Sequence, residues 1–245
     1  MGTADELVPL LKKLRLSGVL DTYELRVQQA IDDRVPPGEF LVRLLRDEVD
    51  RREAKQLASR LRKASFDQHK TLEEFDFAFN DGIDKPRIID LATCSFVEHK
   101  ANVLLLGPTG TGKSHLAQAL GNRACRRGFS TLFIDAQRLL NDLRAARADN
   151  TLSRRLQRYL KLDVLIIDDV GLHPLQDTDR IDLYDIVRGR YEVGSIVLTS
   201  NRAVEELHGL FGDPLLASAA MDRLLHHAHI LELTGRSYRT MKRTG

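Results

Sequence analysis

The stretch NVLLLGPTGTGKS, residues 102–114, decides the fold of this chain of 245 residues. Residues 103–106 form a short apolar run with the length of a buried strand, and a glycine-rich loop follows directly. The loop ends in Gly-Lys-Ser, which completes the pattern G-x-x-x-x-G-K-[ST], and the helical pattern HLAQALGNRAC comes next. A strand before this loop and a helix after it are the structural context that the phosphate-binding motif requires.

The loop contains the chemistry that binds the phosphates of a nucleotide. Its glycines let successive N–H groups turn toward an anion, and the following helix adds the partial positive charge of its N-terminus. Lys113 is predicted to reach the β- and γ-phosphates, and the Ser114 hydroxyl to bind Mg²⁺. The alternative is a glycine-rich turn without a ligand. The predicted nucleotide-binding residues are Gly107, Pro108, Thr109, Gly110, Thr111, Gly112, Lys113, Ser114 and His115.

Composition and charge exclude few classes of partner. The chain has 37 Lys and Arg against 35 Asp and Glu, a net charge of +2, so any surface for nucleic acid must arise from local segregation of charge. Cys94 and Cys125 lie far apart in sequence, as is typical of thiols in a reducing compartment. The first residues, MGTADELVPL, lack the pattern of a secretion signal, and no apolar run approaches membrane-spanning length. We expect a cytoplasmic protein with no membrane partner.

Residues 1–64 show helical patterns and no strand signal, which predicts a small all-α domain. An apolar stripe from Leu7 to Leu14 has the spacing of an amphipathic helix, and we expect Ser17-Gly18 to end that helix. A second stripe covers residues 20–31, and a third helix opens at Phe40.

The third helix becomes almost wholly charged in the stretch RDEVDRREAKQ, residues 46–56. Its bases could neutralise DNA phosphates, which would make binding salt-dependent. The alternative is a solvated helix with i,i+4 ion pairs such as Asp47 with Arg51. The residues alone leave both interpretations open. The candidate nucleic-acid contacts are Arg51, Arg52, Lys55, Arg60, Arg62 and Lys63.

Residues 65–85 are predicted to form a connector to a second domain, residues 86–245. The alternation of Phe75, Phe77 and Phe79 is typical of a half-buried extended segment. Because three aromatic rings would not remain in a free linker, we expect the connector to pack against the domain that follows.

Strand and helix patterns alternate after residue 102. The candidate strands are 103–106, 131–135, 164–168, 195–199 and 229–233. Apolar strands joined by helical segments predict a parallel sheet covered by helices on both faces. Ligands of such sheets gather at the carboxyl ends of the strands.

Polar side chains follow two of these strands. Asp168 is predicted to hold Mg²⁺ opposite Ser114, and Asp169 to orient and deprotonate an attacking water. A pair of surface aspartates in a turn is the alternative. Asn201 follows the next strand, where its amide would sense the γ-phosphate or, alternatively, cap the helix that follows.

Two arginines near the end of the sequence complete the set of candidate catalytic residues. Arg223 lies on the helix before the last strand and Arg239 beyond that strand. An arginine that reaches a γ-phosphate stabilises the charge of the transition state, and a neighbouring molecule can supply it. Either residue could instead form a surface ion pair.

Together the phosphate loop, IIDDVG (166–171), DRLLHHA (222–228) and GRSYR (235–239) resemble one family. The chain is similar to IstB-type ATP-binding proteins, the helper ATPases of bacterial insertion-sequence transposition, which are related to DnaC-type helicase loaders within the AAA+ ATPases. The likeness includes EFLVRLLRDEVDRRE (39–53) and FDFAF (75–79). It implies an α/β P-loop AAA+ core without the usual helical lid, preceded by a DNA-binding domain.

The resemblance also implies partners and roles. It implies ATP-dependent self-assembly into a ring or filament on double-stranded DNA, which remodels the DNA and engages a cognate transposase. By position, Asp168 and Asp169 match the Walker B pair, Asn201 sensor 1, Arg223 the arginine finger and Arg239 sensor 2. It favours the DNA-contacting interpretation of the basic third helix. The residue after the magnesium aspartate is usually Glu, so the shorter Asp169 predicts slow, switch-like hydrolysis.

Three other functions stay open. A helicase loader would bind a replicative helicase through its amino-terminal module. A small-molecule kinase would use the same loop but needs an acceptor pocket, which no sequence feature marks. A nucleotide-gated scaffold would need hardly any hydrolysis.

Overall fold

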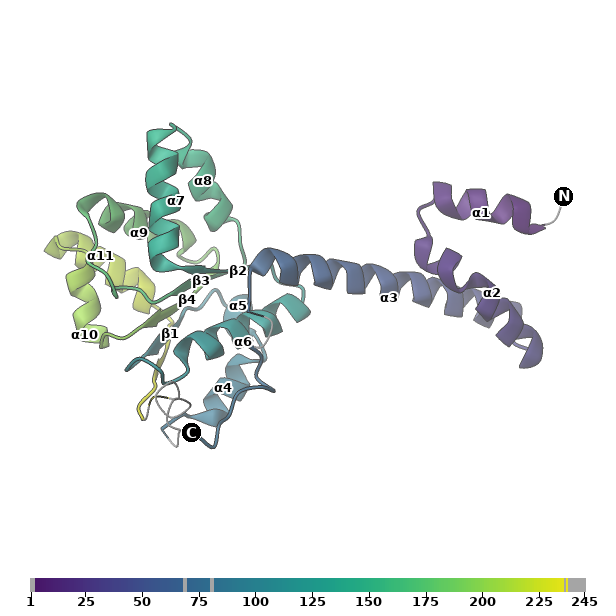
Figure 1. Ribbon diagram of the computed structural model, residues 1–245, viewed down its shortest axis with the longest axis horizontal. Helices are drawn as coiled ribbons and strands as arrows, with labels where there is room; N and C mark the ends of the chain where they lie inside the picture. Colours follow the sequence, from purple (N-terminus) through teal and green to yellow (C-terminus); the bar gives the residue numbers. More distant parts are fainter. Residues whose placement is uncertain (1–2, 68–69, 80–81, 236, 238–245) are drawn as a thin grey trace. The chain divides into compact units, whose positions relative to one another are not determined.

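The computed structural model describes residues 3–67, 70–79, 82–235 and 237. Its contacts divide the chain into two compact units, Met1–Ser59 and Arg60–Gly245 (Figure 1). Within the described residues, no helix combines the length and the apolar character needed to cross a membrane.

The first unit is built from helices around a small core. Its helices are α1 (Thr3–Lys13), α2 (Ser17–Asp32) and the part of α3 (Pro37–Ala64) that belongs to this unit. Leu11, Val19 and Leu44 are buried where the three helices meet. The predicted all-α character is therefore confirmed for this unit.

Ser17-Gly18 begins a helix and does not end one, so our expectation for this pair was wrong. Gly18 is buried in the first turn of α2, and a Cβ atom there would lie 2.7 Å from the Cα atom of Glu48 on α3. The Gly18 N–H donates to Glu48 Oε2 at 2.5 Å. The glycine permits a close approach of two helices, a tertiary requirement that the local sequence does not reveal.

Asp47 does not pair with Arg51, the i,i+4 partner named in the solvated-helix alternative. Arg26 on α2 donates two hydrogen bonds to the Asp47 carboxylate, from Nε at 2.8 Å and from Nη2 at 2.7 Å. These bonds lower the pKa of Asp47 to about 2. Arg51 pairs with Asp21 on α2 instead. Pairs between helices replace the i,i+4 pair because a forked guanidinium–carboxylate contact is stronger than a surface pair on one helix.

The second unit contains a parallel sheet of five strands in the order β2-β3-β4-β1-β5. This arrangement confirms the predicted α/β class and all five candidate strands, within one residue at each end. The strands are β1 (Val103–Leu106), β2 (Thr131–Asp135), β3 (Val164–Asp168), β4 (Ser195–Ser200) and β5 (His229–Glu232).

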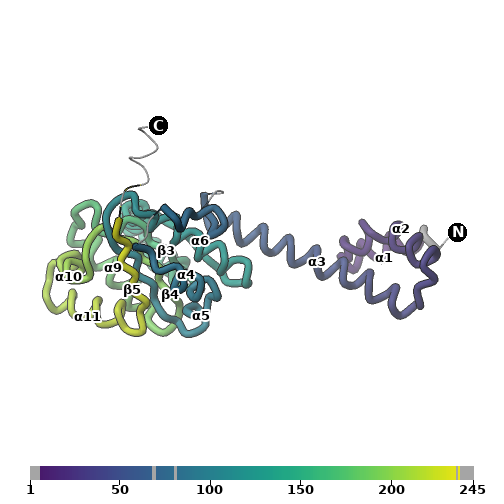
Figure 2. Tube along the Cα trace, turned by 90° about the horizontal axis from the view of Figure 1, so that it is seen from below, coloured from purple at the N-terminus to yellow at the C-terminus, as the bar shows by residue number. Residues whose placement is uncertain are grey.

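Helices cover both faces of the sheet, and Figures 1 and 2 show the two layers. One layer consists of α4 (Lys85–Leu91), α5 (Ser95–Glu98) and α6 (Lys113–Arg126). The other consists of α7 (Ala136–Ala148), α8 (Leu152–Leu160), α9 (Asp177–Arg190), α10 (Val204–Leu207), the 3₁₀ turn η1 (His208–Leu210) and α11 (Pro214–Leu225). Alternate residues of β1 point into the two cores, Val103 and Leu105 toward α6, and Leu104 and Leu106 toward α9 and α11. In the described part of the chain, no helix follows β5.

The connector forms turns and loop, not the extended segment that its alternating phenylalanines suggest. The segment runs back along α6, because Phe66 lies against Gly121 near the middle of the helix and Phe75 lies against Gly112 at its start. Between these points the Asp67 N–H donates to Gln118 Oε1 at 2.7 Å. Phe75 and Phe77 therefore pack on the core of the second unit as expected, and Phe75 does so at the start of α6.

Candidate nucleotide-binding site

The loop between β1 and α6 has the backbone shape of a phosphate cradle. Gly107, Gly110 and Gly112 all adopt positive φ angles, of 133°, 87° and 100°. A Cβ atom at Gly107 would lie 2.1 Å from the carbonyl oxygen of Leu233, just past the end of β5. Glycine is required there because the edge strand and the loop approach closely, and positive φ angles favour glycine at the other two positions.

Lys113 is buried inside this loop. Its Nζ atom donates to the carbonyl oxygens of Gly107 at 2.7 Å and Pro108 at 2.8 Å, and only 5% of the residue is exposed. The side chain therefore curls back over the loop from the first residue of α6. A phosphate bound in the cradle would meet this ammonium group at short range.

Ser114 faces Asp168 across the carboxyl edge of the sheet. Burial raises the pKa of Asp168, and hydrogen bonds from the hydroxyls of Thr199 and Ser114 lower it. Thr199 Oγ1 donates to Asp168 Oδ1 at 2.5 Å. The structure thus brings together the two residues that the sequence predicted as magnesium ligands.

The surroundings of Asp168 suit a divalent cation. Asp168 as a whole is 8% exposed, and its carboxylate forms no ion pair with any described residue. Its partners are neutral hydroxyls, while Asp135 and Asp169 add negative charge nearby. A buried carboxylate without a cationic partner is electrostatically costly, and a hard cation bound by carboxylate and hydroxyl oxygens would remove that cost. Ser114 and Asp168 are the residues that would hold Mg²⁺.

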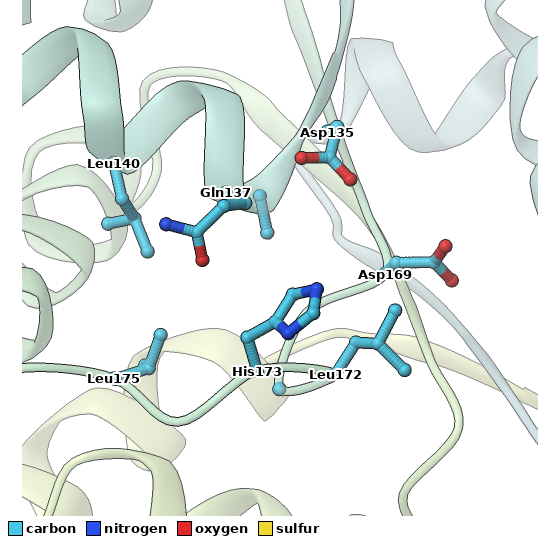
Figure 3. Close-up of a pocket in the computed structure, with 9 residues that line it drawn as sticks. Asp135, Gln137, Leu140, Asp169, Leu172, His173 and Leu175 are labelled. Carbon is cyan, nitrogen blue, oxygen red and sulfur yellow. The ribbon is translucent and has the colours of Figure 1, made fainter.

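Asp169 is held in a conformation that few non-glycine residues adopt. Its φ angle is 55°, its N–H donates to Thr199 Oγ1 at 2.9 Å, and the residue is half-buried. Asp is among the residues that tolerate this left-handed region. In Figure 3 the Asp169 carboxylate points away from Gln137 and His173.

A small pocket lies beside Asp169 at the carboxyl ends of β2 and β3. It is formed by the start of α7 and by the loop after β3, from which His173 projects between Gln137 and Leu172 (Figure 3). Asp135 at its rim accepts the Arg138 N–H at 3.0 Å and so caps α7. No sequence motif marks this pocket, because its residues come from two loops that only the sheet brings together.

Asn201 directly follows β4 and is exposed. The preceding residue, Ser200, accepts the Gly107 N–H at 3.1 Å through its carbonyl oxygen, so Asn201 lies beside the start of the phosphate loop. The alternative role as a helix cap is not realised, since α10 is capped at Ala203, whose N–H donates to Glu206 Oε2 at 3.2 Å.

His115 is turned toward the connector. Its Nε2 atom lies 2.8 Å from the carbonyl oxygen of Thr71, and its ring meets the Phe75 ring edge-on at 5.0 Å between centroids. The imidazole is therefore engaged away from the cradle. Its position on the helix still places the His115 N–H in the first turn of α6, where N–H groups have no partner within the helix.

Thr199 is a site residue that the sequence analysis missed. One hydroxyl contacts both aspartates, donating to Asp168 and accepting from the Asp169 N–H. The only local signal was a polar residue within the apolar run SIVLTSN. Its meaning depends on β4 pairing with β3, which places Thr199 next to Asp168.

We predict that Thr199→Val will impair hydrolysis more than nucleotide binding. Valine keeps the shape but leaves the Asp169 N–H and the Asp168 carboxylate without their partner, so both aspartates lose their fixed positions. A displacement of about 1 Å in a catalytic group can lower the rate by about 10²-fold. We therefore expect kcat for ATP to fall about 10- to 100-fold, with the dissociation constant of ATP within about threefold of wild type. Steady-state turnover and calorimetry measure the two quantities.

Thr131→Val is the matched control. Thr131 is also a buried strand threonine, but it is the first residue of β2 and so lies at the amino ends of the strands, away from the two aspartates. An unchanged kcat in Thr199→Val would show that the hydroxyl does not position the aspartates.

Arg223 lies at the opposite edge of the sheet from the phosphate loop. It is in the last turn of α11, and the carbonyl oxygen of the next residue, Leu224, accepts a hydrogen bond from the side chain of Asn102 at 2.9 Å. Asn102 precedes β1, which rises about 3.3 Å per residue, so the two ends of this four-residue strand are about 10 Å apart. Figure 2 shows α11 at the lower end of β5. Arg223 therefore lies away from its own phosphate loop.

Arg239 lies outside the described residues. Ser237, two positions earlier, is described, and its Oγ atom is so close to Gly110 that a Cβ there would lie 2.1 Å from it. The tail after β5 thus returns to the phosphate loop at Ser237.

The six candidate DNA contacts differ in how they are engaged. Arg51, Arg52 and Arg60 bind groups of their own unit, as Arg52 Nε does with Glu48 at 2.6 Å and Arg60 Nε with the Cys125 carbonyl at 3.0 Å. Lys55 in the first unit, and Arg62 and Lys63 in the second, are exposed and form no ion pair with any described residue. The charges of Lys55, Arg62 and Lys63 are therefore available to bind a polyanion.

Comparisons with known proteins agree with this site. Residues 9–245 match the family model described as IstB-like ATP binding protein. The chain is 40% identical over 234 residues to a Pseudomonas aeruginosa protein named as an ATP-binding protein of insertion sequence IS21, covering 96% of this chain and 88% of that protein.

Solved structures show the same fold. The replication initiator DnaA, determined bound to AMPPCP and single-stranded DNA, superposes with a TM-score of 0.59 at 22% identity, over 70% of this chain and 52% of that one. The DnaC helicase loader superposes with a TM-score of 0.53 at 22% identity, over 61% of this chain and 87% of that one. The second unit therefore has the P-loop AAA+ fold. With the family match across nearly the whole sequence, the chain belongs to the IstB-like ATP-binding protein family associated with insertion sequences.

Proposed function

We propose that this protein is an ATPase that assembles head to tail on double-stranded DNA, remodels the DNA and recruits or activates the transposase of its insertion sequence. The observation that carries the proposal is the position of two functional groups in the second unit. The phosphate loop is at the carboxyl edge of the sheet, and Arg223 is at the amino edge. The carboxyl edge and the amino edge of the sheet can come together only when they belong to different copies of the chain.

The proposed site binds ATP with Mg²⁺. The glycine cradle and Lys113 hold the phosphates, while Ser114 and Asp168 hold the cation, which when bound neutralises charge that develops on the phosphates. Asp169 accepts a proton from the attacking water, and Asn201 orients that water or the γ-phosphate. Arg239 is proposed as a further cation for the phosphates, on the basis of its motif alone.

Arg223 is proposed to complete the site of the adjoining subunit. A guanidinium offers several N–H donors in a fixed planar fork that suits phosphate oxygens. A contact between opposite edges of two copies is heterologous, and repetition of such a contact produces a ring if the rotation closes and a helical filament if it does not. Loss of the γ-phosphate would remove the group that joins the subunits, so hydrolysis would loosen the assembly.

Lys55, Arg62 and Lys63 are proposed as the DNA contacts among the candidate bases, because their charges are exposed and not paired with described residues. A single subunit would bind DNA weakly through so few phosphate contacts. Assembly of many subunits along one duplex would add these contacts and convert weak binding into strong binding. The transposase partner is proposed from the insertion-sequence relatives.

The proposal is tested by the binding of the full chain to a fluorescent duplex with ATP and with ADP, over a range of salt concentrations. We expect tight binding and large assemblies only with ATP. Arg62→Ala/Lys63→Ala should reduce the slope of log affinity against log salt by about two, one for each lost phosphate contact, and weaken binding about 10- to 100-fold at low salt.

Lys12→Ala/Lys13→Ala is the matched control, because it removes two exposed bases from the last turn of another helix. We expect this variant to bind DNA like the wild type. Equal binding in ATP and ADP, or an equal loss in both double variants, would contradict the proposal. If the chain captured a replicative helicase but did not bind duplex DNA, the helicase-loader alternative would be favoured.

A further inference from the structure

Two guanidinium groups lie near the ring of Tyr184 on α9. The Cζ atom of Arg188, one turn later on the same helix, lies 5.7 Å from the centre of the Tyr184 ring. The Cζ atom of Arg223 on α11 lies 5.9 Å from it. Both distances are within the range of cation–π contacts. The ring therefore links the helix that bears Arg223 to the neighbouring helix.

The two arginines differ in how their charge is balanced. Arg188 is 60% exposed and pairs with Asp185 at 3.0 Å. Arg223 forms no ion pair with any described residue, and its Nη1 atom donates to the carbonyl oxygen of Ala219 at 2.6 Å. A guanidinium has five N–H donors, so this single bond leaves most of its donors available. Arg223 is thus held in place without being neutralised.

The Tyr184 ring packs against a buried core. Tyr184 is half-buried against the core that α9 and α11 share, which includes Leu183, Val187 and Ala220. A tyrosine has two χ angles, and a packed ring keeps one orientation. The guanidinium of Arg223 contacts both the Tyr184 ring and the Ala219 carbonyl oxygen. A long flexible side chain is thereby confined to a narrow set of positions.

We propose that Tyr184 is a positioning residue for Arg223, and that its ring pre-orients the guanidinium for the triphosphate bound by the next subunit. This inference rests on the proposed function, because it assumes that Arg223 acts between subunits. The ring acts through Arg223 and touches neither nucleotide nor water. Its contribution is to remove the entropy that a free arginine would lose on reaching the phosphates.

The ring face carries this role, and the hydroxyl does not contribute to it. Tyr184→Phe keeps the aromatic face, whereas Tyr184→Leu fills a similar space against the core without one. A cation–π contact at a partly exposed position corresponds to a factor of about two to five in an equilibrium or a rate. We expect Tyr184→Leu to lower ATP turnover by about two- to fivefold and Tyr184→Phe to keep the wild-type rate.

Tyr191→Leu is the matched control. Tyr191 directly follows α9, and its hydroxyl lies 3.2 Å from Nδ1 of His226, but its ring has no guanidinium over it among the described residues. We expect wild-type turnover in this variant. Thermal unfolding of all three variants shows whether the Tyr184→Leu protein remains folded at the assay temperature.

A mixing experiment shows on which subunit Tyr184 acts. Asp169→Asn keeps the phosphate loop and Arg223 but lacks the proposed base, so it supplies an intact arginine without hydrolysing ATP. A small amount of Tyr184→Leu is mixed with an excess of Asp169→Asn, so that most hydrolysing subunits receive their arginine from the Asp169→Asn neighbour. We expect turnover per Tyr184→Leu subunit to rise to that of wild type diluted in the same excess.

Three results separate the inference from the function on which it rests. The same dilution should rescue Arg223→Ala, and a failure there would overturn the action of Arg223 between subunits. Rescue of Arg223→Ala without rescue of Tyr184→Leu would overturn the role of Tyr184 and leave the proposed function standing. Wild-type turnover in undiluted Tyr184→Leu would also overturn the role of Tyr184, and so would equal losses of turnover in Tyr184→Leu and Tyr184→Phe.

Discussion

Replacement of Arg223 with alanine should reduce ATP hydrolysis by about 10³-fold or more, the size of effect that an arginine finger has on phosphoryl transfer. Arg223 lies at the edge of the sheet away from its own phosphate loop, so the loss should arise at the contact between subunits. Binding of ATP to an isolated subunit should change little. Phosphate release at several protein concentrations measures the rate, and light scattering measures the assembly.

Arg158→Ala is a suitable control for this variant, because Arg158 is also in the last turn of a helix on the same face of the sheet and is exposed. It should hydrolyse ATP at the wild-type rate. An Arg223→Ala protein that assembles with ATP and hydrolyses it normally would refute the shared site, and the head-to-tail assembly would lose its structural basis.

Lys113→Ala should strongly weaken the binding of ATP. The ammonium group is buried in the loop, and loss of one partner of a buried charged contact costs about 2–5 kcal/mol. The dissociation constant of ATP should therefore rise by about two to three orders of magnitude. Isothermal titration calorimetry on the full chain gives this value directly, and ATP-dependent assembly and DNA binding should disappear with it.

The loop itself must remain folded in that variant for the result to be informative. Lys113 donates to two carbonyl oxygens of the loop, so its removal affects the loop as well as the ligand. A melting temperature near that of wild type without nucleotide, together with the loss of the ATP-induced rise in melting temperature, separates the two effects. A Lys113→Ala protein that binds ATP with wild-type affinity would contradict the proposed site. Lys161→Ala, which removes an exposed lysine, is the charge control.

Local patterns predicted the architecture well because the relevant physics is local. β1 and the first four residues of β3 are unbroken apolar runs, as is typical of strands buried on both faces. The loop glycines were predicted for a backbone reason, and Gly107, Gly110 and Gly112 all adopt positive φ angles. The family resemblance, carried by motifs along the whole chain, is confirmed by the family match.

The errors have a common physical cause. Ser17-Gly18 has the local composition of a helix end, yet Gly18 is needed where Glu48 of another helix approaches. Asp47 has an arginine four residues later, yet it pairs with Arg26 on the neighbouring helix. The connector phenylalanines alternate as in a strand, yet the connector forms turns and loop, and Phe75 packs at the start of α6. In each case a tertiary contact outweighs a weak local preference.

The sequence by itself determined the elements, the phosphate loop and the acidic ends of the strands, since each depends on residues that are neighbours in the chain. Only the tertiary structure decided that Thr199 joins Asp168 to Asp169 and that Arg223 lies at the opposite edge, over the ring of Tyr184. The order of strands in the sheet and the packing of α9 on α11 create these contacts. Neither is encoded at a fixed spacing, because each depends on which apolar surfaces bury one another.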